Sequence, residues 1–185
     1  MEENMNGPEE TEKEKPVKRT VTLHGRTMTL MGEEMKVGAT APDFKVTDNE
    51  MLPMKFLRTY KGKVSVILSV PSLDTQVCDL ETRRFNQEAE ALGPEVNVIA
   101  VSMDLPFAQK RWCGAAGIRS VRTFSDHQKA DFGKAYGVLI KELRLLARAV
   151  FVVDKDGIVK YAQTVPEIGK EPDYEEVLNA VKALI

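Results

Sequence analysis

The sequence predicts an α/β fold with a central mixed sheet flanked by helices, on three observations. Two short, nearly continuous apolar runs, residues 64–70 and 96–101, are typical of strands buried on both faces. A helix ending near Leu92 lies between them, which makes a parallel, right-handed βαβ unit. Near the C-terminus, a hairpin signal at Asp154–Gly157 joins two further strands ahead of an amphipathic helix.

The N-terminal part predicts a tail followed by a hairpin. Residues 1–19 are charged and poor in large apolar groups, so we expect a tail that orders no core. Residues 20–185 are long enough for one domain with a sizeable core. Alternating residues around His24 and Gly25 indicate a β-hairpin, with His24 as a turn residue. Then follow an extended connector at residues 38–44, a short strand at 44–46, and a short helix or turn at 54–60.

The segment after the first buried strand places a cysteine at the start of a helix. Pro71 ends the strand, and Asp74 or Thr75 is suited to cap the helix. Cys78 then falls in the first turn, where unpaired N–H groups and the helix dipole favour thiolate over thiol. The helical period turns its sulfur toward the core. Cys78 is therefore either a nucleophile or a buried cysteine that only fills space.

The second half continues the alternation of helices and strands. A short capped helix over residues 104–112 carries Pro106 in its first turn and ends at Cys113 and Gly114. A weak strand, a helix ending at Gly137, two hairpin strands and a closing helix follow at residues 120–124, 129–136, 148–154, 157–163 and 173–184. A βαβ half followed by a β-hairpin and a final helix matches the thioredoxin fold.

Composition excludes several classes of function. The 26 basic and 28 acidic residues are interspersed and give a net charge of −2, which offers no footprint for nucleic acid or an anionic membrane. The apolar runs are too short to span a bilayer, and no signal peptide is visible, so we expect a cytoplasmic protein. The two cysteines lie 35 positions apart, and neither histidine has zinc-ligand spacing to them.

Arg148 and Cys113 each have two interpretations from the residues alone. Arg148 immediately precedes an apolar strand, where it is either a surface arginine or a charge that reaches a partner. Cys113 is either a small packing residue at a helix end or a second reactive thiol. Glu88, Asp104 and Asp154 are best explained as solvated surface residues or caps.

A family resemblance favours the reactive interpretations. The segment from Pro71 through Thr75 to Cys78 resembles the Pro-x-x-x-Thr-x-x-Cys motif of the peroxiredoxins. The resemblance runs from about Thr20 to the C-terminus and is specific to the thiol peroxidase branch, the atypical two-cysteine peroxiredoxins. Its further motifs, in order, are Phe85-Asn-Gln, Asp104-Leu-Pro-Phe-Ala-Gln, Cys113-Gly, Ala135-Tyr-Gly-Val, Ala147-Arg-Ala-Val and Glu171-Pro-Asp-Tyr-Glu.

The resemblance implies an activity and a role for each candidate residue. Cys78 is expected to be the peroxidatic nucleophile and Cys113 the resolving cysteine, which would form an intramolecular Cys78–Cys113 disulfide. Thr75 and Arg148 are expected to bind the thiolate or the peroxide, and Pro71 to shield them from water. The substrate would be hydrogen peroxide or an organic hydroperoxide, the reductant thioredoxin, and the assembly a homodimer. This chemistry needs no metal, flavin or haem cofactor.

Two alternative functions use the same thiols. A thiol–disulfide oxidoreductase normally needs two close thiols, and the separation of the cysteines speaks against it. In a peroxide-sensing redox switch, oxidation of the pair would only change binding to a partner. Consumption of peroxide at catalytic protein concentration distinguishes an enzyme from both.

Overall fold

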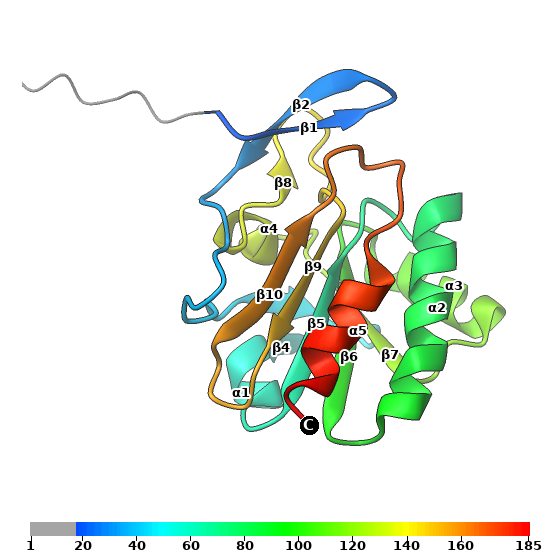
Figure 1. Cartoon of the computed structure of the whole chain (residues 1–185). Helices are drawn as coiled ribbons and strands as arrows, with labels where there is room; N and C mark the ends of the chain where they lie inside the picture. The colour runs from blue at the N-terminus through cyan, green and yellow to red at the C-terminus, as the bar shows by residue number, and fades with distance from the viewer. Residues whose placement is uncertain (1–17) are drawn as a thin grey trace, which may run out of the picture.

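The computed structural model describes residues 18–185, so nearly all of the charged tail predicted at residues 1–19 lies outside the described residues. A seven-stranded sheet forms its centre, in the order β10-β9-β5-β6-β7-β3-β4 (Figure 1). Its strands are β3 (Lys45–Thr47), β4 (Pro53–Lys55), β5 (Val64–Ser69), β6 (Val96–Ser102), β7 (Val121–Ser125), β9 (Ala149–Val153) and β10 (Val159–Thr164).

The sheet is mixed, as the sequence predicts. Strands β5, β6 and β7 are parallel, and every other pairing in the sheet is antiparallel. Strand β5 is buried along its whole length because β6 and β9 flank it and helices cover both faces. The β5–β9 register pairs Ser69 with Ala149, so Arg148 lies beside the carboxyl end of β5.

Helices cover the two faces of this sheet. The helices of the described chain are α1 (Phe56–Tyr60), α2 (Gln76–Leu92), α3 (Pro106–Ala116), α4 (Asp131–Ala135) and α5 (Tyr174–Lys182). Helices α2 and α5 bury Cys78, Phe85 and Val177 in a core with β5 and β6, whereas α1 and α4 contribute Phe56 and Phe132 to the core on the opposite face. Figure 1 shows α2 and α5 side by side over the sheet.

The predicted N-terminal hairpin is confirmed. Strands β1 (Thr20–Leu23) and β2 (Arg26–Met31) pair through a turn at His24 and Gly25, both with positive φ. The sequence pattern missed β8 (Leu139–Ile140), which adds to β2 and makes a separate three-stranded sheet. Two residues are too few to show a strand period, so only the tertiary pairing reveals β8.

Several predicted helix boundaries are wrong: residues 54 and 55 belong to β4 and not to a helix or turn, α5 ends at Lys182, and α3 and α4 also differ. Helix α3 does not end at Cys113 but continues to Ala116, because Gly114 is accommodated within it and Gly117, with φ +68°, terminates it. Helix α4 begins at Asp131 rather than at residue 129, since Ala130 adopts a left-handed conformation with φ +51°. Cys113 therefore lies within a helix.

The described part of the chain contains no helix that is both long and apolar enough to cross a membrane.

Candidate active site

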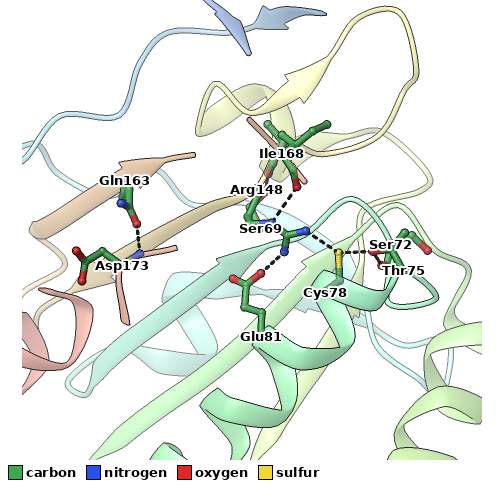
Figure 2. A network of polar contacts seen from close by, with 10 residues as sticks. Ser69, Ser72, Thr75, Cys78, Glu81, Arg148, Gln163, Ile168 and Asp173 are labelled. Carbon is green, nitrogen blue, oxygen red and sulfur yellow. Dashed lines mark hydrogen bonds and ion pairs between the residues drawn. The ribbon is translucent and has the colours of Figure 1, made fainter. Parts of the chain in front are cut away.

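The candidate site lies at the carboxyl ends of the parallel strands. Strand β5 ends at Ser69, and residues 70–75 lead directly into α2. Thr75 is the N-cap of α2, which decides between the two caps that the sequence allowed, and Cys78 is in the first turn as predicted. Pro71 is buried directly after the strand. Figure 2 shows Thr75, Cys78, Glu81 and Arg148 converging at this end of the sheet.

Cys78 is fully buried, and its sulfur faces the core. Phe85 and Ala89 follow it on the same stripe of α2 and pack in the same core, which confirms the inward direction predicted from the helical period. Sγ nevertheless has two polar neighbours, from Thr75 and Arg148. A cysteine that only filled space would need neither.

Thr75 uses its hydroxyl for the sulfur instead of capping its own helix. Oγ1 makes no capping hydrogen bond and lies 2.7 Å from Sγ of Cys78 and 2.9 Å from the carbonyl oxygen of Ser72. A hydroxyl carries one proton, and a carbonyl oxygen can only accept. When Cys78 is a thiol, its S–H can donate to Oγ1 while Thr75 donates to Ser72. When Cys78 is a thiolate, the Thr75 proton turns toward the sulfur.

Arg148 is a buried cation held on three sides. Its Nε donates to the carbonyl oxygen of Ile168 at 3.1 Å, Nη1 pairs with Oε2 of Glu81, and Nη2 lies 3.3 Å from Sγ of Cys78 (Figure 2). Only 1 % of the residue is exposed, so the interpretation as a surface arginine is wrong. Although burial disfavours its charge, Glu81 and Cys78 raise the pKa of Arg148 above its usual value. The guanidinium is therefore fixed and cationic beside the sulfur.

Glu81 is a site residue that the sequence analysis missed. It lies three residues after Cys78 on the same face of α2 and is completely buried. Burial raises the pKa of Glu81 to about 7, against the attraction of Arg148, which lowers it. Its second oxygen, Oε1, has no hydrogen-bond partner among the described residues. The carboxyl group orients the guanidinium through one oxygen, as expected of a partner fixed by burial.

Asp104 is not the helix cap or solvated residue that the sequence suggests. The N-cap of α3 is Leu105, and no side chain caps that end of the helix. The Asp104 carboxylate instead accepts hydrogen bonds from the hydroxyl of Ser72 and the backbone N–H of Leu73. Asp104 therefore contacts the segment that carries Thr75. Asp154, in contrast, does cap a turn, by accepting from the N–H groups of Asp156 and Ile158.

Cys113 lies apart from this constellation. It is half-buried in α3, and its Sγ contacts the hydroxyl of Thr123 on β7 at 3.3 Å. It lines a surface pocket of about 230 Å³ together with Asn49 and Ile118. Burial raises the pKa of the Cys113 thiol, against hydrogen bonds from Thr123 and Asn49 that lower it. Both cysteines are free thiols, and the structure brings Cys113 to Thr123 and not to Cys78.

Two hydrogen bonds, from Trp112 to Asp79 and from Arg83 to Ala116, link the helices that carry the cysteines, and a third lies within α2. Nε1 of Trp112, next to Cys113, donates to Oδ1 of Asp79, next to Cys78, at 3.1 Å. Arg83 donates from Nε to Oδ2 of Asp79 at 2.8 Å and from Nη1 to the carbonyl oxygen of Ala116 at 2.9 Å. These contacts, which we call the α2–α3 clasp, keep α3 docked on α2.

Comparisons with known proteins agree with this geometry. The Redoxin family model matches residues 36–178, more than half of the chain. The chain belongs to the redoxin family. It is 56 % identical to the thiol peroxidase of Bacillus subtilis strain 168 over 89 % of this chain and 98 % of that protein. It is 57 % identical to the thiol peroxidase of Oceanobacillus iheyensis over 86 % of this chain and 96 % of that protein.

A solved structure supports the same assignment. A peroxiredoxin-like protein from Aquifex aeolicus superimposes with a TM-score of 0.83 at 47 % identity, covering 90 % of this chain and 98 % of that one. The resemblance to the thiol peroxidase branch of the peroxiredoxins is thereby confirmed, and so is the predicted thioredoxin-like α/β fold.

Proposed function

We propose that the protein is a thiol-dependent peroxidase that reduces hydrogen peroxide and organic hydroperoxides. The observation that carries this proposal is the environment of the Cys78 sulfur, which a hydroxyl and a fixed guanidinium both contact at the start of a helix. These groups supply the two needs of the reaction: they stabilise a thiolate, and they place donors where an oxygen becomes anionic. The thiol peroxidases of similar sequence support the assignment.

The first step forms a sulfenic acid on Cys78. The thiolate attacks one peroxide oxygen, a S–O bond forms and the O–O bond breaks. The electron pair of the O–O bond leaves with the second oxygen, which departs as hydroxide or alkoxide and takes up a proton as water or alcohol. Protein acceptors engage three of the five N–H groups of Arg148 among the described residues. The remaining two can donate to the peroxide oxygens, and buried Pro71 helps to exclude water.

The second step closes a disulfide. The Cys113 thiol gives up its proton and attacks the Cys78 sulfenic acid, which releases water and leaves a Cys78–Cys113 disulfide. A dithiol reductant of the thioredoxin class then reduces the disulfide and is itself oxidised. A disulfide requires Cα atoms about 4.4–6.8 Å apart. Since Cys113 contacts Thr123 and α3 is docked on α2, we propose that the first turn of α2, the part of α3 around Cys113, or both unwind during this step.

Peroxide turnover with a thioredoxin system tests the proposal. Wild type should consume peroxide at catalytic protein concentration, and Cys78→Ser should not, because serine is not ionised near neutral pH. Cys113→Ser should stop after the first turnover, since only resolution is lost. Full steady-state activity of Cys113→Ser would refute the resolving role. Reduction of insulin disulfides without peroxide consumption would support a thiol–disulfide oxidoreductase instead.

We also propose that the protein is cytoplasmic and, from the resemblance, that it is a homodimer. Sedimentation of the reduced protein tests the dimer.

A further inference from the structure

The Asp104 carboxylate is a point where three hydrogen bonds meet. Oδ1 accepts from the hydroxyl of Ser72 at 2.7 Å, and Oδ2 accepts from the backbone N–H of Leu73 at 2.8 Å and from the hydroxyl of Ser102 at 2.7 Å. Two of these donors belong to the segment between β5 and α2, and the third ends β6. Asp104 thus ties the end of β6 to the segment that begins the candidate active site.

Further hydrogen bonds connect Asp104 to the Cys78 sulfur through Ser72. Besides donating to Asp104, the Ser72 hydroxyl accepts from the N–H of Asp74 at 3.3 Å. The Ser72 carbonyl oxygen accepts both from the N–H of Thr75 at 3.1 Å and from its hydroxyl at 2.9 Å. That hydroxyl is the group 2.7 Å from Sγ of Cys78 (Figure 2). A continuous chain of hydrogen bonds therefore runs from Asp104 through Ser72 and Thr75 to Cys78.

Buried groups hold Asp104 and Ser102 in place. Gln109 is fully buried, and its Nε2 donates to the hydroxyl of Ser102 at 2.9 Å and to the carbonyl oxygen of Phe124 at 2.8 Å. The hydroxyl of Ser125 donates to the carbonyl oxygen of Asp104. Thr75, in contrast, is exposed, and its hydroxyl makes hydrogen bonds to the Ser72 carbonyl oxygen and the Cys78 sulfur. The Asp104 end of the chain is thus held by buried groups, whereas Thr75 is held by Ser72, by Cys78 and by the first turn of α2.

We infer that Asp104 is a positioning residue for the reduction of peroxide. It fixes residues 72–75 so that the hydroxyl of Thr75 stays directed at the Cys78 sulfur. Asp104 touches neither the sulfur nor the peroxide and acts through Ser72 and Thr75. The inference rests on the proposed function, but the effect of Asp104 on Cys78 can be measured without peroxide.

The decisive experiment is a double-mutant cycle of Asp104→Ala and Thr75→Val. The reduced full-length variants receive one equivalent of peroxide, and the rate of Cys78 oxidation is followed by mass spectrometry of the peptide that carries Cys78. Asp104→Ala should slow oxidation about 100-fold, the order expected for a misplaced reacting group. In the Thr75→Val background the same change should cost little more, because the group that Asp104 positions is already gone. Additive losses would overturn the inference.

A conservative variant and a remote control separate positioning from loss of stability. Asp104→Asn keeps an acceptor for the Leu73 N–H and should lose less rate than Asp104→Ala. Asp154→Ala removes another carboxylate that accepts hydrogen bonds from backbone N–H groups, here those of Asp156 and Ile158 at 2.9 Å each, in the β9–β10 turn. It should keep the wild-type rate even where its unfolding midpoint falls as far as that of Asp104→Ala. An equal loss of rate in Asp154→Ala would assign the Asp104 effect to stability.

Alkylation of Cys78 by iodoacetamide distinguishes failure of this inference from failure of the proposed function. Without the Thr75 hydroxyl directed at the sulfur, the midpoint of the alkylation–pH profile should move to higher pH in Asp104→Ala and not in Asp154→Ala. A wild type that consumes no peroxide would refute the proposed function while this profile still reports on Asp104. An unmoved midpoint in Asp104→Ala would refute the positioning role.

Discussion

Replacing Arg148 by alanine should destabilise the fold as well as slow the chemistry. The change leaves the Glu81 carboxyl group without its counter-ion at a position with no exposed surface. Removing one partner of a buried ion pair costs about 3–5 kcal/mol. At ~2–4 °C per kcal/mol for a chain of this size, the melting midpoint should fall by roughly 6–20 °C.

The loss should depend on pH, and its sign follows from Glu81. Burial raises the folded-state pKa of Glu81 to about 7 even with Arg148 present, and removing the cation raises that pKa further. Stability from a raised carboxyl pKa is present below the unfolded pKa and is lost as pH rises through the folded pKa. Urea unfolding should therefore show a larger deficit for Arg148→Ala near about pH 8 than near about pH 5.

A double variant separates stability from chemistry. Glu81→Leu with Arg148→Met replaces the ion pair by apolar side chains and should recover part of the lost stability. The carbonyl oxygen of Ile168 still loses its donor, so about 1–3 kcal/mol remains missing. Peroxide reduction should stay about 10²–10³-fold slow in single turnover, because the donor beside the sulfur is absent. A double variant that reduces peroxide at the wild-type rate would show that Arg148 serves the fold alone.

Three further experiments test the protonation of Glu81, the α2–α3 clasp and the unwinding around the cysteines. Wild-type stability should fall by at most about 1.4 kcal/mol per pH unit between about pH 4.5 and 7, because only the folded chain holds a proton on Glu81 in that range. Urea unfolding should show that Glu81→Gln removes this fall. Trp112 is the one tryptophan in the sequence and adjoins Cys113, so its emission should change when the disulfide forms after peroxide. Asp79→Ala removes the Asp79 contacts of the α2–α3 clasp and should speed this change, whereas Asp79→Asn, which keeps an acceptor for Trp112, should speed it less. Equal rates in wild type and both variants would contradict a restraining clasp. Backbone hydrogen exchange at residues 76–79 and 110–116 should be faster in the disulfide form, and identical exchange in both forms would contradict unwinding.

The central strands of the sheet and the position of Cys78 were predictable because their signals are local. Continuous apolar runs mark β5 and β6 as strands buried on both faces, and Pro71 marks where the first of them ends. An N-cap at Asp74 or Thr75 places Cys78 in the first turn of a helix, whatever the rest of the chain does. The inward direction of the sulfur follows from the helical period.

Glu81 was not found, although a signal exists. It is three residues after Cys78 and four before Phe85, which places a carboxylate on the inner stripe of α2. A charge on a buried stripe requires a partner, and Arg148 before a buried strand is the complementary anomaly. The sequence shows each anomaly separately, but only the β5–β9 register brings the two side chains together.

Asp104, unlike Glu81, was singled out from the sequence but was given the wrong role. An aspartate between a strand and a helix with proline in its first turn fits a cap, and that prediction is wrong. Because β5 and β6 are parallel, the segments that follow them meet at one edge of the sheet, which allows contact between Asp104 and residues 72–73. Whether the carboxylate turns toward α3 or toward that segment depends on side-chain packing that no sequence period encodes.

The most direct test of the proposed chemistry is the number and position of the sulfenic acids formed in one turnover, counted as dimedone thioether adducts. Reduced Cys113→Ser should receive one equivalent of peroxide in the presence of dimedone, followed by mass spectrometry of the intact chain and of its peptides. The account predicts about one sulfenic acid per chain, trapped on Cys78. Unmodified Cys78 after the peroxide has been consumed would contradict the central claim.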